Sequence, residues 1–169
     1  MVDISTSRGT LARMTTRDPR SDTRPDAWCT LQRAYTRLGG LLSRELYTAT
    51  GLSEADYQIL EALHRADGRL RAVQLREQLG WEKSRLSHQA RRMEQRGLLL
   101  RTECPVEGRG TDLVLTDTGR QAAIDAIDIR AGSVHTHVVA TLDRAQLRQL
   151  SDISQQLDAH AAEANDHSF

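Results

Sequence analysis

The sequence predicts a mainly α-helical fold that contains one β-hairpin. Apolar residues recur at three- and four-residue steps through most of the chain, the spacing of helices that bury one face. Only around residues 98–116 does the spacing of apolar residues shift toward the two-residue period of a β-strand. There, two short apolar runs flank a segment rich in Gly and Pro. Aromatic residues make up only 4% of the chain, so its core must be aliphatic. Such a sparse core favours further burial at a subunit interface.

Five segments are expected along the chain. Residues 1–25 mix Ser, Thr, Arg, Asp and Pro without hydrophobic periodicity, which is typical of a disordered arm. Residues 26–52 hold a first helix, 53–116 a compact lobe, 117–163 two further helices, and 164–169 a tail.

Helix start and stop residues place the first elements. Gly51 ends the first helix, and Ser53 begins the next with Asp56 at the third helical position, a near capping-box arrangement. The buried face of this second helix is expected at Tyr57, Leu60 and Leu63.

Two short helical stretches follow the turn at residues 67–68, separated by little more than Gly80. The first, 72–79, is expected to bury Val73, Leu75 and Leu79. The second, 82–96, has apolar residues only at Leu86, Ala90 and Met93. The rest of its surface is polar and basic: Lys83, Ser84, Arg85, Ser87, His88, Gln89, Arg91 and Arg92. Two short helices around a Gly-containing turn, the second of them basic, are typical of a helix-turn-helix.

A hairpin is expected directly after this second helix, once Gly97 has ended it. Its strands are 98–103 and 111–116, and the connector carries Arg109 between two glycines. A hairpin in this position is a wing. Thr116 is the expected N-cap of a long helix, 117–139, and a last helix follows Asp143, with Gln146 at its capping-box position.

The charge of the chain is unevenly distributed. Lys plus Arg equals Asp plus Glu over the whole sequence, but residues 71–110 carry nine basic and five acidic groups, whereas 111–169 carry four basic and nine acidic groups. Binding to phosphates depends on the local field, so the basic block is compatible with nucleic acid. A solvated surface is the alternative.

Three short motifs resemble the MarR family of bacterial regulators. They are the helix ending Met93-Glu94-Gln95-Arg96-Gly97-Leu98, the wing sequence Glu107-Gly108-Arg109-Gly110, and the wing-to-helix junction Leu115-Thr116-Asp117-Thr118-Gly119-Arg120. The resemblance implies a winged helix-turn-helix with a two-stranded β-wing and N- and C-terminal dimerisation helices. It also implies a homodimer that reads a pseudo-palindromic operator, typically a repressor released by a small phenolic or aromatic ligand or by thiol oxidation.

The expected DNA contacts lie on the second helix of the helix-turn-helix and on the wing. Ser84, Ser87, His88 and Arg91 share one helical face, opposite the apolar residues. Arg85 and Arg91 are candidates for bidentate contact with guanine, and Lys83, Ser84 and Ser87 for phosphate contact. Arg109 is the candidate for the minor groove.

Other functions find little support in the sequence. No catalytic or cofactor fingerprint occurs, so we expect neither an enzyme nor a cofactor. His135 and His137 are two residues apart, too far around a helix to share a metal. Lacking a signal peptide or an apolar run of membrane-spanning length, the protein is expected in the cytoplasm.

Two alternatives stay open. A winged helix can serve as a protein-interaction module that does not read DNA. Cys29, near the start of the first helix, where peroxide-sensing members of the family carry their reactive cysteine, is a possible redox site. Buried free thiol is the commoner condition, however.

Overall fold

The computed structural model describes residues 23–103 and 110–166 and divides the chain into two compact units, residues 1–37 and 38–169. Helix α1, Thr23–Thr50, runs from the first unit into the second. It begins three residues before the expected start, so the last residues of the predicted disordered arm are helical. Most of that arm lies outside the described residues.

In the lobe predicted for residues 53–116, the described residues form three helices and three strands. Its helices are α2, Glu54–Arg65, α3, Ala72–Leu79, and α4, Lys83–Gln95. Ser53 caps α2, and the capping box with Asp56 is present, as the sequence predicted. The helices enclose an aliphatic core that includes Ile59, Leu60, Leu63, Leu75 and Met93, all fully buried.

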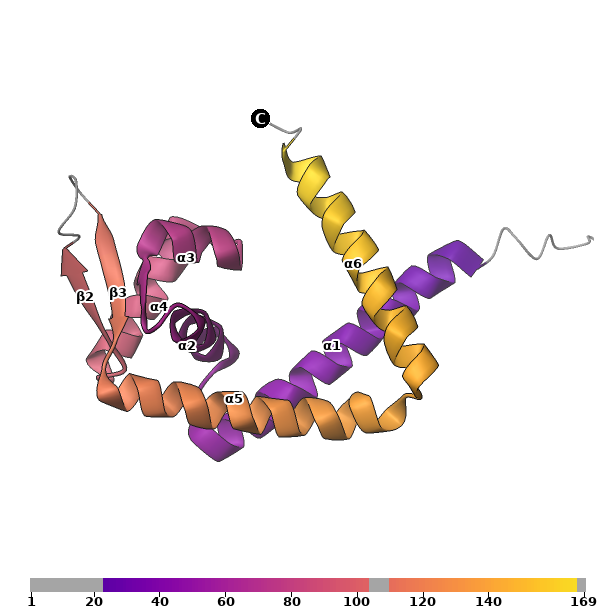
Figure 1. The fold of residues 1–169 in the computed structure, drawn as a ribbon, viewed down its shortest axis with the longest axis horizontal. Helices are drawn as coiled ribbons and strands as arrows, with labels where there is room; N and C mark the ends of the chain where they lie inside the picture. The colour runs from indigo at the N-terminus through magenta and orange to yellow at the C-terminus, as the bar shows by residue number, and fades with distance from the viewer. Residues whose placement is uncertain (1–22, 104–109, 167–169) are drawn as a thin grey trace, which may run out of the picture. The chain divides into compact units, whose positions relative to one another are not determined.

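The sheet of this lobe is antiparallel, with strand order β1-β3-β2 (Figure 1). The predicted wing is confirmed as β2, Leu99–Glu103, and β3, Thr111–Leu115, paired in register from Leu99 opposite Leu115. Strand β1, Arg69–Arg71, was not predicted; it pairs with the other edge of β3. Three residues, two of them charged, are too few to show an alternating pattern.

The remaining helices are α5, Asp117–His137, and α6, Arg144–Asp166, joined by a 3-10 turn at Val139–Thr141. Thr116 caps α5, accepting a hydrogen bond from the Gly119 amide. At the start of α6, the Gln146 side chain accepts a hydrogen bond from the Asp143 amide, so both predicted caps are confirmed. Helix α6 extends through Asp166, into the segment predicted as a tail. No described helix is apolar and long enough to cross a membrane.

Two acidic side chains join α5 to α1 and α2 through hydrogen bonds and ion pairs. Glu45 of α1 accepts a hydrogen bond from the Ser133 hydroxyl at 2.5 Å, and its other carboxylate oxygen lies 2.7 Å from Nε2 of His137. Glu54 of α2 accepts from Arg130 and from Ser43. These contacts hold the second half of α1 against α5 and the lobe.

Two predictions of burial were wrong. Val73, expected in the core, is 51% exposed, and Gln89, expected on the surface, is only 4% exposed. Both errors concern the helix-turn-helix. They matter because Val73 lies in a surface groove and Gln89 joins α4 to α2.

Candidate nucleic-acid interface

Helix α4 presents a polar face to solvent. All six α4 residues singled out from the sequence are exposed: Lys83, Ser84, Arg85, Ser87, His88 and Arg91. The opposite side, Leu86, Ala90 and Met93, is buried in the lobe, as predicted. The dipole of α4 favours anions at its N-terminus; its first turn contains no acidic residue, although its N-cap is the exposed Glu82.

A buried polar contact fixes α4 against α2. The Gln89 side-chain amide donates to the Asp56 carboxylate at 2.6 Å, and Arg92 in turn donates to Gln89. Gln89 falls between Leu86 and Met93, three residues from the first and four from the second. Helical spacing could therefore have placed it on the buried stripe.

Asp56 joins this contact to the end of α1. Its carboxylate accepts from the backbone and hydroxyl of Ser53 and from Arg96 at 2.8 Å, while Arg96 also donates to the Gly51 carbonyl. Burial alone would raise the pKa of Asp56, but the hydrogen bonds from Ser53 and Arg96 outweigh it and lower that pKa below its ordinary value. Asp56 therefore remains ionised and holds α4 and the α1–α2 junction together at neutral pH.

A basic groove of about 550 Å³ lies beside α4, between α3 and the base of the wing. Four basic residues line it: Arg71, Arg76, Lys83 and Arg101. None of its described lining residues is acidic, and the lining also includes the apolar side chains of Val73, Leu86 and Leu113. Such a groove favours binding of a negatively charged strand or group.

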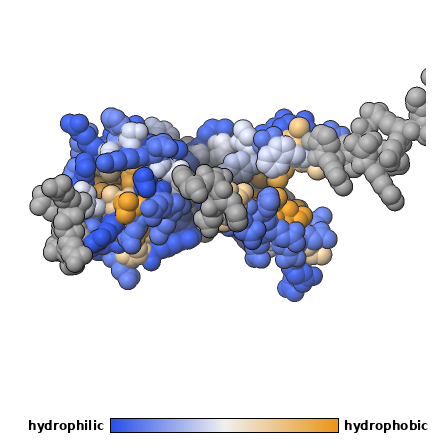
Figure 2. All heavy atoms as spheres, turned by 90° about the horizontal axis from the view of Figure 1, so that it is seen from above, coloured by the Kyte–Doolittle hydropathy of each residue, from blue (hydrophilic) through white to orange (hydrophobic). Residues whose placement is uncertain are grey.

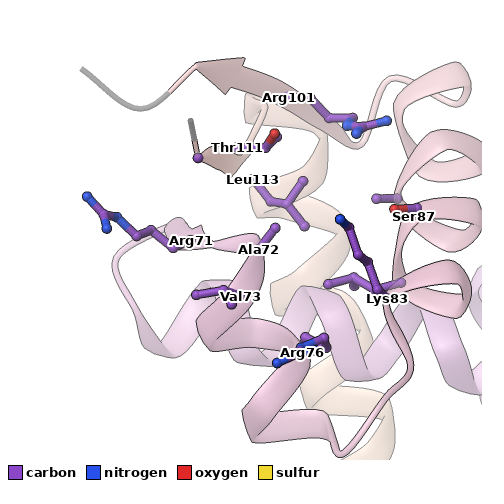
Figure 3. Close-up of a pocket in the computed structure, with 12 residues that line it drawn as sticks. Arg71, Ala72, Val73, Arg76, Lys83, Ser87, Arg101, Thr111 and Leu113 are labelled. Carbon is purple, nitrogen blue, oxygen red and sulfur yellow. The ribbon is translucent and has the colours of Figure 1, made fainter. Parts of the chain in front are cut away.

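The basic side chains enter the groove from different elements. Figure 3 shows Lys83 pointing from the start of α4 across the groove, and Arg101 reaching toward α4 from β2. Arg76 lies on α3, where it also pairs with Glu77 at 3.5 Å, and Arg71 projects outward at the opposite end. Ser87 adds a hydroxyl from α4.

Sequence reasoning singled out Lys83 and Ser87 but missed Arg71, Arg76 and Arg101. The signal was present only as the excess of basic residues over 71–110. The three missed residues belong to β1, α3 and β2, and the fold alone brings them together. The surrounding surface is largely hydrophilic, with a small hydrophobic patch exposed on the lobe (Figure 2).

Arg85 takes a different position from the rest of the face. Its guanidinium carbon lies over the Trp81 ring, 4.0 Å from the centroid. Trp81 is 7% exposed and belongs to the core.

The base of the wing is held by an ion pair. Arg69 of β1 donates to the buried carboxylate of Asp112 on β3 at 2.8–2.9 Å. Arg109, the predicted minor-groove contact, and the other residues of the wing tip lie outside the described residues. The structure therefore describes the two strands of the wing, β2 and β3, and not the tip that joins them.

The motifs at either end of the wing have structural roles. Gly97 ends α4 with a φ of 71°, and the Thr116 hydroxyl donates to its carbonyl at 2.7 Å. Gly119 packs so closely that a Cβ there would lie 1.8 Å from the Leu98 carbonyl oxygen. These contacts fix the angle at which the wing leaves α4 and enters α5.

Other sequence candidates lie apart from this face. Cys29 is exposed on α1 within the first unit and forms no disulfide among the described residues. In the same described ranges, 23–103 and 110–166, no three His, Cys, Asp or Glu side chains gather as metal ligands.

The chain is similar to known transcriptional regulators. Residues 50–110 match the sequence profile of the MarR family. The structure of AbsC, a MarR family regulator from Streptomyces coelicolor, is 31% identical over 85% of this chain and 97% of its own, with a TM-score of 0.73. Sco3205, a MarR family regulator from the same organism solved with DNA, is 27% identical over 83% and 92%, with a TM-score of 0.78.

A third structure extends the fold comparison. An organohalide-sensing regulator, solved with 2,4-dichlorophenol bound, is 18% identical over 89% of both chains, with a TM-score of 0.72. No curated protein matches the sequence. The profile, the identity to AbsC and its near-complete coverage agree with the winged helix-turn-helix seen here. The chain belongs to the MarR family of transcriptional regulators.

Proposed function

We propose that this protein is a homodimeric transcription regulator that binds duplex DNA through α4 and the adjoining basic groove. The observation that carries the proposal is the junction of two surfaces. A polar helix face lies directly beside a groove lined by four basic residues and, among its described lining residues, by no acidic one. Sequence-specific binding needs both, because phosphate contacts position a protein and base contacts specify the site.

The two surfaces would divide this work. Helix α4 enters the major groove with Arg91 and His88 toward the base edges and Ser84 toward a phosphate, and Arg reads guanine there through two hydrogen bonds. The DNA backbone that borders the major groove would lie along the basic groove of the protein. Its phosphates would be bound there by Lys83, Ser87 and Arg101, which line that groove. Arg109, outside the described residues, is assigned from the sequence to the adjacent minor groove.

A second copy of the chain completes the regulator. Helix α6 carries an apolar stripe whose members Leu150, Ile153 and Leu157 are 40–54% exposed in the single chain. Packing this stripe against a partner removes it from water and produces two α4 helices related by a twofold axis. The operator would then be pseudo-palindromic, with its half-sites about 34 Å apart, one turn of the duplex.

Regulation by a ligand is the finer part of the proposal. In the family resemblance, a small aromatic or phenolic effector releases a repressor from its operator. A ligand can do so only if it binds the free form more tightly than the DNA-bound form. The test adds a panel of phenols and aromatic acids to the operator complex and seeks compounds that weaken binding without unfolding the protein.

The test of DNA binding begins with recovery of bound genomic fragments, which supplies the operator. Fluorescence anisotropy then compares wild type with Arg91→Ala and with Arg148→Gln, which removes a charge from α6. We expect Arg91→Ala to lose about 1–3 kcal/mol at one base pair of each half-site, and Arg148→Gln to bind as wild type. Equal affinities for all three proteins would contradict the assignment of α4.

The groove is tested by the salt dependence of the same titration. Arg101→Gln should weaken binding to all sequences alike. It should also reduce the slope of log K against log salt by about 1 for each phosphate that the side chain no longer neutralises. An unchanged slope would remove Arg101 from the interface.

The remaining alternatives give different results in these assays. A protein-interaction module recovers no specific fragment and shows no preference over competitor DNA. A thiol switch at Cys29 predicts that peroxide abolishes binding and that Cys29→Ser prevents this effect. Repression is tested by transcription in vitro from the recovered promoter, which the protein should reduce.

A further inference from the structure

Trp81 is held rigidly at the entrance to α4. It follows Gly80, whose left-handed conformation, with a φ of 61°, ends α3. The Trp81 amide donates to the Arg76 carbonyl at 3.0 Å, and its side chain is buried in the core. The indole therefore has a fixed position relative to the first turn of α4.

Arg85 lies one turn along α4 from this ring. Its guanidinium carbon stands 4.0 Å from the ring centroid, well within the range of a cation–π contact. Within the described part of the chain, Arg85 makes no ion pair or hydrogen bond. The contact with the ring uses no hydrogen-bond acceptor, so the N–H donors of Arg85 stay available to a ligand.

A free arginine side chain loses much rotamer freedom when it binds a base. Where a ring already holds the guanidinium in one position before binding, the side chain loses less conformational entropy when it binds the base. Arg91, the other candidate for guanine, has no ring contact among the described residues, so the two arginines of the same helix are held differently.

We propose that Trp81 is a positioning residue for DNA reading, which holds the Arg85 guanidinium ready to contact a guanine edge. This inference rests on the proposed function and goes beyond it, because it assigns base specificity at one operator position to a pair of residues. A core residue with no other role would affect stability and not the preference for one base pair.

The experiment is a double-mutant cycle measured by operator binding. It compares Trp81→Leu, Arg85→Ala and the double variant on the selected operator and on operators substituted at each position. We expect Arg85→Ala to weaken binding at least about fivefold per half-site. Trp81→Leu should weaken it about two- to fivefold per half-site and relax preference at the same base pair. In the Arg85→Ala background, Trp81→Leu should have no further effect on binding.

Two further variants keep the test decisive. Trp81→Phe retains a ring, so it should keep most of the wild-type affinity and preference, which can be measured even if Trp81→Leu proves too unstable. Combining Trp81→Leu with Arg91→Ala should give additive losses, because Arg91 is independent of the ring.

The outcomes separate this inference from the proposed function. Additive effects of Trp81→Leu and Arg85→Ala, a failure of Trp81→Phe to keep most of the affinity and preference, or a loss that spreads over all base pairs would overturn the role of Trp81. Binding that still depends on Arg91 would then leave the proposed function standing. Binding insensitive to Arg85 and Arg91 alike would overturn both.

Discussion

The winged lobe and helix α6 use their apolar residues in opposite ways. In the lobe, Leu63, Leu75 and Met93 are fully buried by other parts of the same chain. In α6, Ile153 and Leu157 are about half exposed. The lobe can therefore hold its surface groove and α4 in place with its own core, whereas α6 keeps an apolar stripe that no described part of the chain covers. The difference separates the part that would contact DNA from the part that would set the assembly.

The largest expected effect comes from a charge in the α6 stripe. Leu157→Asp removes apolar burial from both copies of a dimer, about 3–6 kcal/mol in all, and adds a charge that would have to be desolvated. We expect the dimer dissociation constant to rise at least about 100-fold in analytical ultracentrifugation. Gln155→Asp puts the same charge on the opposite face of α6 and should leave the dimer intact. Equal assembly of the two variants would show that the stripe is not the interface.

A cavity in the lobe should act differently. Leu63→Ala is expected to lower the free energy of unfolding by about 2–5 kcal/mol, because Leu63 is fully buried. Urea unfolding followed by circular dichroism measures this decrease. Repeating the measurement at several protein concentrations distinguishes Leu63→Ala from Leu157→Asp. The loss of stability in Leu63→Ala should be the same at each concentration, because the change lies within one chain and leaves the dimer contacts intact. The effect of Leu157→Asp should depend on concentration. A decrease below about 1 kcal/mol would contradict the burial of Leu63.

The Asp56 contacts predict a dependence on pH. The folded-state pKa of Asp56 is lowered, so its contribution is present above the unfolded value of about 3.9 and is lost as pH falls through the folded value. Asp56→Asn should cost about 1.5–3 kcal/mol of stability at pH 7, since it removes hydrogen bonds to a charged group. The difference from wild type should shrink below about pH 4.

A control for this prediction is Asp125→Asn, which alters an exposed carboxylate on α5. It should follow wild type across the same pH range. Urea unfolding at several pH values distinguishes the two carboxylates, and an Asp56→Asn deficit that stays constant down to about pH 3 would contradict the account of the network.

The smallest expected effect lies at the junction of wing and α5. Thr116→Ala removes the N-cap of α5 and the hydroxyl contact to Gly97, at a cost of about 1 kcal/mol. Thermal unfolding should show a modest fall in Tm, and Thr116→Ser should restore it. An equal fall in both variants would indicate that the hydroxyl is not the stabilising group.

Sequence alone predicted the elements that depend on local chemistry. The capping boxes at Ser53 and Asp143, the N-cap at Thr116 and the buried side of α4 follow from residues three or four positions apart. The wing strands followed from their change of period. The resemblance to the MarR family rested on motifs whose described members, such as Gly97 and Gly119, prove to be structural.

What the sequence did not predict depends on contacts between distant segments. Gln89 meets Asp56 across 33 residues of sequence, and Arg69 of the unpredicted β1 meets Asp112 across 43. The basic groove likewise needs separate elements to come together, so Arg76 and Arg101 gave no local signal. Local periodicity describes one element at a time and does not report which charges will become neighbours.

The central claim, that α4 and the groove bind duplex DNA, can be tested at one side chain. Lys83 is the only lysine in the sequence and is exposed at the mouth of the groove. In a Gln155→Lys variant, the lysine introduced on α6 serves as an internal reference for acylation by an amine-reactive reagent, measured by mass spectrometry. When operator saturates the protein, Lys83 should be acylated only in the small fraction of protein that is unbound, so its acylation rate should fall to that fraction of the rate without operator. Acylation of the introduced lysine should be unchanged. Equal acylation rates of Lys83 with and without bound operator would contradict the account.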